Sequence, residues 1–172
     1  MDKKHKIILA AISEFAKNGF EKASMDAVAI KAKVAKGTVF YHFKSKSDLF
    51  AEIVEEGKNK LAEKMVKETK DLKNNKDKIE KIIDIEVEFI KKYHNLFLVY
   101  LEDVIKKSIS FEVINKVIDD GKKTDEFRKD LDVKTASLGL FWMTAMICLN
   151  TKTVDSNEIR KLVIGGIKKQ LN

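Results

Sequence analysis

A chain of 172 residues in which 44% are hydrophobic and 35% are charged is long enough to bury a core and too apolar to be a disordered tail. It has no proline and only seven glycines, so most of the usual markers of turns and sheets are missing and an all-helical protein is expected. The formal net charge of +7 favours a polyanionic partner.

The positive charge is concentrated at the N-terminus. Residues 1–46 contain ten lysines and four acidic residues, a net charge of +6, whereas the remaining residues carry +1. Lysines near phosphates gain affinity by releasing condensed counterions, so this distribution is typical of a nucleic-acid-binding module. Charge alone leaves open a surface of lysines that contact only solvent.

Signals of export or membrane insertion are weak. Cys148 is the only cysteine, so no intrachain disulfide can form and a reducing cytoplasm fits. The apolar stretch at residues 7–12 is too short for a signal peptide, and residues 138–149 reach only about half of the roughly 20 residues of a membrane span. We expect a soluble, cytoplasmic protein with no membrane partner.

Three short helices are expected in the first quarter of the chain. Apolar residues recur at helical spacing at residues 8–15, and Gly19 can end this helix in a left-handed conformation. Ser24 can cap a second helix. After a short connection at residues 33–34, a third helix is expected from about residue 35 to residue 42.

A long fourth helix is expected to begin at the pattern Ser45 to Asp48, which matches a helix start, and to run to about Asp71. It would join the head to a second module, in which apolar periodicity continues at residues 79–93, 96–107, 111–119, 133–150 and 157–171. The predicted fold class is therefore all-α, with an N-terminal three-helix helix-turn-helix head at residues 1–46 and a C-terminal helical bundle at residues 47–172.

The helix, turn and helix at residues 25–42 form a unit whose second helix can enter the major groove of DNA. The first turn of that helix offers an ammonium group, a residue without a side chain and a hydroxyl, from Lys36, Gly37 and Thr38. Lys36 can donate either to guanine or to phosphate, Gly37 permits close approach to DNA, and Thr38 can bond phosphate or contact a thymine methyl group.

Three more side chains follow along the same stretch. Tyr41 suits a phosphate, and His42 either does the same or packs against the head. Lys46 adds a cation at the start of the fourth helix, where free backbone amides favour an anion.

The sequence Phe-Ala-Lys-Asn-Gly-Phe at residues 15–20, Val28-Ala29 and residues 34–49 resemble the head of the tetracycline-repressor (TetR/AcrR) family, with no gaps in the spacing. The similarity covers about residues 7–50, and its core, Lys-Gly-Thr-x-x-Tyr-His-Phe-x-x-Lys, is much more specific than a generic helix-turn-helix. The resemblance implies a homodimer whose helical body binds an effector that weakens DNA binding. It also implies DNA contacts at the starts of helices two, three and four, so the predicted DNA-binding residues are Ser24, Met25, Lys36, Gly37, Thr38, Tyr41, His42 and Lys46.

Three residues depart from the family pattern. Lys33 stands where the family usually has Gly, so it is expected to adopt a left-handed conformation at a cost of about 1 kcal/mol. Ala35 replaces the usual capping Ser, with a loss of about 1 kcal/mol of capping energy. Phe40 replaces a common Tyr and so lacks a hydroxyl that reaches the DNA backbone.

Two sets of residues in the body are candidates for a ligand pocket and a dimer interface. Aromatic and methionine side chains could line an apolar pocket, or each of them could simply be part of the hydrophobic core. The candidates are Phe89, Tyr93, Phe97, Tyr100, Phe111, Phe141, Trp142 and Met146. The last two predicted helices could pack against a second copy, although a monomer's own core explains their apolar residues almost as well: Leu138, Ala145, Leu149, Ile159, Leu162, Val163 and Gly166.

No catalytic, metal or cofactor site is recognisable in the sequence. It has no nucleophile elbow, phosphate loop or Cys-x-x-Cys pair, and Asp84, Glu86 and Glu88 are expected on a solvated helix face. These features favour a DNA-binding transcriptional regulator and not an enzyme: a ligand-responsive repressor that acts as a homodimer on a pseudo-palindromic operator in double-stranded DNA and responds to a small apolar effector. The alternative is a helical module for small molecules or proteins that has lost specific DNA recognition.

Overall fold

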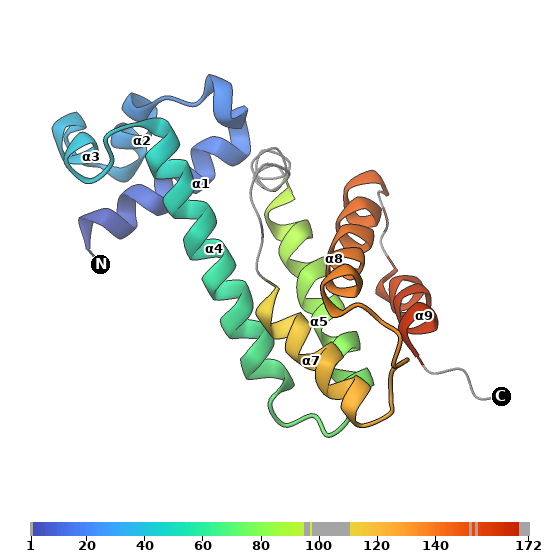
Figure 1. The fold of residues 1–172 in the computed structure, drawn as a ribbon. Coiled ribbons are helices and arrows are strands. Elements are labelled where there is room, and N and C mark those ends of the chain that lie inside the picture. The colour runs from blue at the N-terminus through green and yellow to red at the C-terminus, as the bar shows by residue number, and fades with distance from the viewer. Residues whose placement is uncertain (1, 95–96, 98–110, 152, 154, 169–172) are drawn as a thin grey trace. The chain divides into compact units, whose positions relative to one another are not determined.

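The computed structural model describes residues 2–94, 97, 111–151, 153 and 155–168. Within these residues the fold is all-α, as predicted, and contains eight helices (Figure 1). Their bounds are α1 Lys3–Lys22, α2 Met25–Ala32, α3 Lys36–His42, α4 Lys46–Thr69, α5 Asn75–Lys92, α7 Glu112–Lys123, α8 Val133–Asn150 and α9 Ser156–Ile167. The helix expected at residues 96–107 lies outside the described residues except at residue 97.

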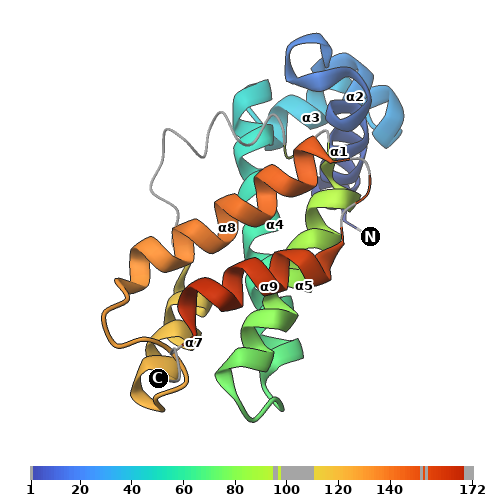
Figure 2. The same ribbon diagram turned by 90° about the vertical axis from the view of Figure 1, so that its right-hand side faces the viewer.

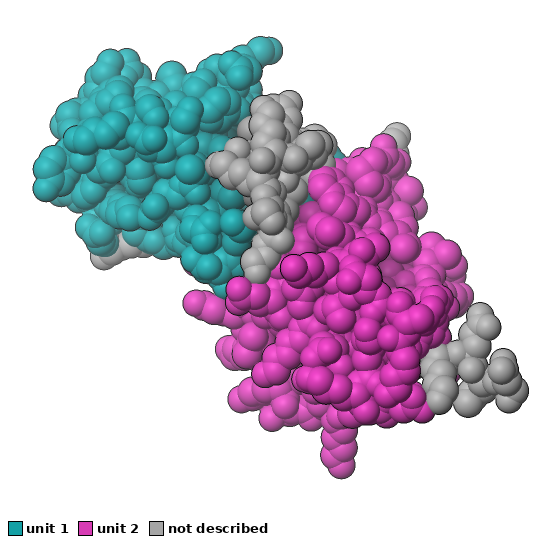
Figure 3. All heavy atoms as spheres, in the orientation of Figure 1, with its two compact units in different colours: residues 1–59, 93–108 teal, residues 60–92, 109–172 magenta. Residues whose placement is uncertain are grey.

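The chain divides into two compact units, coloured separately in Figure 3. One unit comprises residues 1–59 and 93–108, and the other comprises residues 60–92 and 109–172. The division falls within α4, so this long helix contributes its first part to one unit and its last part to the other.

The first unit is built on a small apolar core in which α1, α2, α3 and the start of α4 meet. The ring of Phe15 lies at its centre, with ring centroids 5.7 Å from Phe20 and 5.5 Å from Phe50. Burial of each large apolar side chain contributes about 1.5–3 kcal/mol. These contacts therefore hold α2 and α3, which have only 8 and 7 residues and would not be stable alone. The core side chains with almost no exposed surface are Ile7, Ala11, Phe15, Val28, Val39 and Leu49.

Local sequence signals set the helix ends of this unit. Ser24 caps α2 by accepting a hydrogen bond from the N–H of Ala27 at 3.1 Å, and Ser45 caps α4 by accepting from the N–H of Asp48 at 3.0 Å. Gly19 has a positive φ of 73°, as predicted, but its ψ of 169° lies outside the left-handed helical region, and it kinks α1, which continues as far as Lys22.

The second unit surrounds α5, which packs against α7, α8 and α9. Helix α8 packs against α7 as well and lies beside α9, as Figure 2 shows. The interior face of α5 is formed by Ile79, Ile82, Ile83 and Ile90 at helical spacing. By length and composition alone α8 could cross a membrane, but the core helix of a soluble protein gives the same weak signal, and its contacts with three helices fit the core position.

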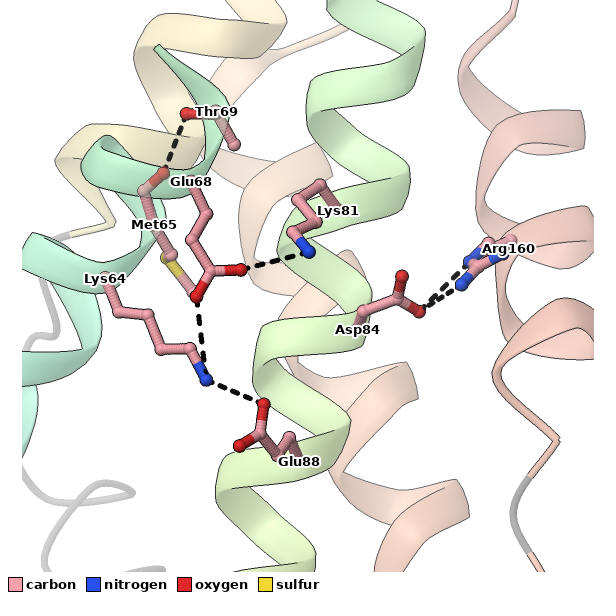
Figure 4. Close-up of polar contacts among 8 residues, drawn as sticks. All are labelled: Lys64, Met65, Glu68, Thr69, Lys81, Asp84, Glu88 and Arg160. Atoms are coloured by element: carbon pink, nitrogen blue, oxygen red, sulfur yellow. Dashed lines mark hydrogen bonds and ion pairs between the residues drawn. The ribbon is translucent and has the colours of Figure 1, made fainter. Parts of the chain in front are cut away.

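Ion pairs connect the helices of the second unit at its surface (Figure 4). The Lys64 ammonium group of α4 lies 2.6 Å from Glu88 of α5, and Lys81 of α5 lies 3.0 Å from Glu68 of α4. On its other side α5 is joined to α9 by an ion pair between Asp84 and Arg160. Because exposed pairs contribute at most about 1 kcal/mol each, they fix the register of the helices more than they stabilise them.

The loop between α7 and α8 is held by contacts that are long-range in sequence. Phe127 is buried against Gly121, where a β-carbon would lie 2.1 Å from the ring. Phe127 also pairs with Lys168 in an isolated antiparallel bridge. The Glu126 carboxylate accepts hydrogen bonds from the N–H groups of Asn75 at 2.7 Å and Lys76 at 3.1 Å.

These contacts explain two helix ends that differ from prediction. Helix α5 begins at Asn75, four residues before the predicted start at residue 79, because the Glu126 carboxylate accepts hydrogen bonds from the free N–H groups of its first turn. Helix α9 ends at Ile167 instead of residue 171 because Lys168 is extended, with φ −66° and ψ 142°, and joins the bridge to Phe127.

The prediction that the acidic residues of α5 share a solvated face was wrong. Glu86 is 1% exposed, because it lies three, four and seven residues from the core isoleucines and therefore shares their face. Asp84 is half-buried and pairs with Arg160. Of the three, only Glu88 is exposed.

Candidate DNA-binding site

The turn between α2 and α3 presents α3 at the surface of the first unit. Lys33 adopts the left-handed conformation with φ 56° and ψ 45°, as the replacement of Gly predicts. The N–H of Lys33 bonds to the carbonyl of Ile30 and that of Val34 to the carbonyl of Ala29, each at 3.1 Å, so the last turn of α2 keeps its partners. Ala35 precedes α3 without a side-chain cap, again as expected.

One face of α3 is buried and the other is open. Val39 faces the core, whereas Lys36, Gly37 and Tyr41 are exposed, and Tyr41 is 77% exposed. A tyrosine ring this exposed gains little from burial in the monomer, so its phenol is available to a partner. A β-carbon at Gly37 would meet nothing within 4 Å, so its surface is open to the close approach of a partner.

His42 and Thr38 lie at the margin of this face. His42 is half-buried, and its ring centroid lies 5.2 Å from Tyr41 and 6.3 Å from Phe43. Thr38 is half-buried at the end of the same first turn as Lys36. The arrangement fits both interpretations of His42, since its ring touches the open face and the core.

Lys36 has an acidic partner that the sequence did not reveal. Its ammonium group lies 2.7 Å from the carboxylate of Asp26 in α2 and 5.8 Å from the ring centroid of Phe40. Both charged side chains are more than half exposed, so the pair contributes at most about 1 kcal/mol and can be exchanged for a contact with DNA. Asp26 therefore holds the Lys36 ammonium group near the Phe40 ring and leaves it exposed to solvent.

Lys46 is tied to the chain between α1 and α2. Its ammonium group donates to the backbone carbonyls of Glu21 at 3.0 Å and Ala23 at 3.2 Å, and it lies 4.6 Å from the ring centroid of Phe20. This lysine thus fastens the start of α4 to the end of α1, a role that residue spacing along the sequence did not indicate.

Ser24 and Met25 stand at the start of α2. The Ser24 side chain is exposed, and its oxygen accepts the capping bond while its hydroxyl proton remains able to donate. The Met25 side chain is 8% exposed and belongs to the core, so a contact from this residue would come from its backbone.

The pocket candidates occupy different surroundings in the second half of the chain. Phe111 and Phe141 lie 5.0 Å apart between centroids, Phe141 and Trp142 lie 5.7 Å apart, and Met146 is exposed. Phe97 is buried, Phe89 and Tyr93 are half-buried, and Tyr100 lies outside the described residues.

The dimer-interface candidates also separate into groups by exposure. Those buried inside their own unit are Ala145, Ile159 and Val163, and Leu149 is half-buried. Those exposed are Leu138 on α8 with Leu162 and Gly166 on α9.

Residues 7–53, which include the whole of α2 and α3, match the sequence model of the family described as bacterial regulatory proteins, tetR family. The chain belongs to the TetR family of transcriptional regulators. This TetR-family protein is therefore a DNA-binding transcriptional regulator with a helix-turn-helix, and it is not an enzyme.

Similarity to known regulators extends along almost all of the chain. The fatty acid metabolism regulator protein of Bacillus subtilis is 24% identical over 182 residues, which cover 94% of this chain and 93% of the relative. The regulator QacR of Staphylococcus aureus is 25% identical over 169 residues, 97% of this chain and 83% of the relative. The crystal structure of FadR from Bacillus subtilis in complex with stearoyl-CoA aligns with a TM-score of 0.80 and 23% identity over 95% of this chain and 98% of that one, which shows the shared fold.

Proposed function

We propose that this TetR-family regulator is a ligand-responsive repressor that binds a pseudo-palindromic operator as a homodimer in the cytoplasm. The observation that carries this proposal is the open face of α3, where Lys36, Gly37 and Tyr41 are exposed in a region with a net charge of +6. Residues 1–46 form the DNA-binding domain in this proposal, and residues 47–172 bind the effector and the second subunit.

The roles of the α3 side chains follow from their exposure and chemistry. Tyr41 donates its phenolic hydrogen to a phosphate, and Gly37 lets the backbone of α3 approach the groove. Lys36 leaves Asp26 and donates to guanine or phosphate. Asp26 is freed in that exchange and lies at the N-terminal end of α2, where the helix dipole stabilises its charge.

An exposed apolar surface on α8 and α9 supports the homodimer. Leu138 and Met146 on α8 and Leu162 on α9 are between 42% and 58% exposed. Large apolar side chains gathered on two adjacent helices are typical of an interface, and exposed Gly165 and Gly166 permit a partner helix to approach closely.

An effector with an apolar part is supported by the aromatic side chains of the second unit, and structures with a similar fold hold small organic ligands. The Bacillus subtilis FadR structure holds stearoyl-CoA, and a regulator from Saccharomonospora viridis, at 15% identity and a TM-score of 0.76, holds choline. For this chain we propose a small molecule with an apolar part that contacts residues such as Phe111 and Phe141. Binding shifts the dimer only if the effector has a higher affinity for the state that does not bind DNA.

Selection of bound duplexes from a random DNA pool tests the DNA-binding part directly. A repressor of this kind yields two half-sites related by two-fold symmetry, whereas recovery without sequence preference favours the alternative of a module that has lost specific recognition. On the selected operator, Lys36→Ala is expected to cost about 1–3 kcal/mol if Lys36 reads a base, with relaxed discrimination at one position. Lys70→Ala is the matched control, because it removes the same charge outside the head. Unchanged binding by Lys36→Ala contradicts the proposed role of Lys36.

A further inference from the structure

Glu86 is a carboxylate with no partner in the interior of the second unit. It is 1% exposed on α5, and neither of its carboxylate oxygens has a hydrogen-bond partner among the described residues. Burying an unpaired carboxyl group is costly, so most proteins avoid it or pair it. Nothing in the packing of α5 requires a glutamate here, because the isoleucines at neighbouring positions fill the same face.

Glu86 is accompanied by other polar atoms that lack partners. The hydroxyl groups of Thr144 and Ser137 on α8 and the side-chain carbonyl oxygen of Asn115 on α7 are buried and have no hydrogen bond to any described residue. The three helices that carry these groups pack against one another in pairs. Of these groups, the Thr144 hydroxyl lies close enough to Glu86 to affect its pKa, and the others are further unpartnered polar atoms on the helices that pack around α5.

Among the residues that the structure describes, no cation forms an ion pair with Glu86. Burial raises the pKa of its carboxyl group to about 8, and only the nearby Thr144 hydroxyl opposes this rise. On α8 the titratable neighbour is Cys148, whose own pKa is raised by burial, lowered by the charge of Lys91 and raised by that of Glu86. On α9 Arg160 pairs with Asp84, and on α7 Lys116 is exposed to solvent.

The unpartnered atoms are mostly acceptors. The side-chain oxygen of Asn115 can only accept, and so can both Glu86 oxygens when the carboxyl group is ionised. Each hydroxyl group can accept as well as donate. A ligand that completes this set must bring N–H or O–H donors, and one that also brings a positive charge compensates the carboxylate. An anionic head group could bond to Glu86 only while the carboxyl group keeps its proton, and it would bring no donor for the Asn115 oxygen.

We propose that Glu86 anchors a binding site for an amphiphilic organic ammonium ion in the interior between α5, α7 and α8. The N–H groups of the ammonium bond to the Glu86 carboxylate and the Thr144 hydroxyl, and the apolar part of the ligand packs against side chains such as Ile83 and Phe141. This site rests on the proposed function, because it names the chemical class of the effector that the second unit receives.

Proton release is the signature of this site. In the empty protein at pH 7 the Glu86 carboxyl group is mostly protonated, because its pKa is about 8. When the ammonium ion binds, the carboxyl proton passes to the buffer and an ion pair forms. Binding at pH 7 therefore releases roughly one proton per ligand, and the affinity rises by about tenfold per pH unit up to pH 8, above which it levels off.

Titration calorimetry on the full chain at pH 7, in two buffers with different ionisation enthalpies, measures both affinity and proton release. The probe is octylammonium, and octanol and octanoate share its chain with a neutral and an anionic head group. We expect octylammonium to bind with proton release, and we expect Glu86→Gln to lower its affinity by about tenfold or more and to abolish the release. Glu88→Gln, which removes an exposed carboxylate from the same helix, leaves both unchanged.

Thr144→Val provides a second variant that retains the carboxylate. It is expected to weaken octylammonium binding severalfold while proton release persists, so the site can be tested even if Glu86→Gln does not fold. The proposal is overturned if octylammonium does not bind, if it binds without proton release, if Glu86→Gln binds it as tightly as the unmodified chain, or if octanol or octanoate binds as well.

Operator binding measured in parallel separates this site from the proposed repressor. If octylammonium binds with proton release and the operator affinity does not change, the site stands and its role as the effector site fails. If octanoate or an acyl thioester releases the operator while octylammonium does not bind, the ligand-responsive repressor stands and the ammonium site is overturned.

Discussion

The buried carboxyl group of Glu86 makes the stability of the protein depend on pH in a defined direction. Its pKa rises from an ordinary value of 4.5 to about 8 on folding, because burial disfavours the charged form. A pKa that is higher in the folded state gives a contribution to stability that is complete below pH 4.5. This contribution is lost as the pH rises from 4.5 to about 8, and it does not change further above pH 8.

The magnitude follows from the size of the pKa change. Each pH unit corresponds to about 1.4 kcal/mol, so the protein loses about 3 kcal/mol of unfolding free energy between pH 4.5 and pH 7 and about 5 kcal/mol by pH 9. Glu86→Gln removes this dependence. The amide of the variant has N–H donors that are buried without partners, which lowers the unfolding free energy by about 1–3 kcal/mol at every pH. The informative quantity is therefore how the difference in unfolding free energy between the variant and the unmodified chain changes with pH.

Urea unfolding of the unmodified chain and of Glu86→Gln from pH 5 to pH 9 measures this difference. The variant is expected to gain about 4 kcal/mol relative to the unmodified chain over that range, with most of the gain below pH 8. Glu88→Gln is the control: it removes an exposed ion pair with Lys64, so its unfolding free energy should run parallel to that of the unmodified chain, lower by at most about 1 kcal/mol. Parallel curves for Glu86→Gln and the unmodified chain would refute the buried, unpaired carboxyl group.

Three further predictions concern packing, backbone strain and assembly. Gly121→Ala places a β-carbon 2.1 Å from the Phe127 ring and should lower the unfolding free energy by about 1–3 kcal/mol. Gly139→Ala adds a β-carbon to a helix where there is open space, so it should raise the unfolding free energy by about 0.5–1 kcal/mol. Thermal unfolding of the two variants measures both changes. Lys33→Gly relieves the left-handed conformation at φ 56° and should raise stability by about 1 kcal/mol in urea titrations, and a loss of stability would contradict the strain. Leu162→Glu should shift the protein from dimer to monomer in sedimentation equilibrium without unfolding it, and an unchanged dimer would exclude the α9 surface.

The parts of the fold that were predicted from the sequence depend on neighbours within four residues. Ser24 and Ser45 cap helices through N–H groups three residues away, whereas the left-handed conformation of Lys33 was expected from the resemblance to the TetR family, which usually has Gly at this position. The capping signals are local because a helix end leaves its unpaired groups next to the capping residue in the chain. The ends of α2 and α3 and the start of α4 were therefore predictable to about one residue, whereas α1 continues three residues beyond the predicted end at Gly19.

The parts that were not predicted depend on contacts between distant residues. The start of α5 at Asn75 is set by Glu126, which is 51 residues away, and the end of α9 is set by the bridge to Phe127. Burial of Glu86 had a signal in the sequence, since it falls on the spacing of Ile79, Ile83 and Ile90. That signal was outweighed by the general rule that charged residues face solvent.

Lys46 shows how a position in the sequence can predict a contact and still miss a second role. The sequence places a cation at the start of a helix, where a phosphate is favoured, and the structure shows the ammonium group bonded to the carbonyls of Glu21 and Ala23. An ammonium group has three N–H donors, and these two bonds leave one of them. The same lysine can therefore fasten α4 to the end of α1 and offer its third donor to a phosphate, so a DNA contact at Lys46 would be held in place by the fold of the head itself.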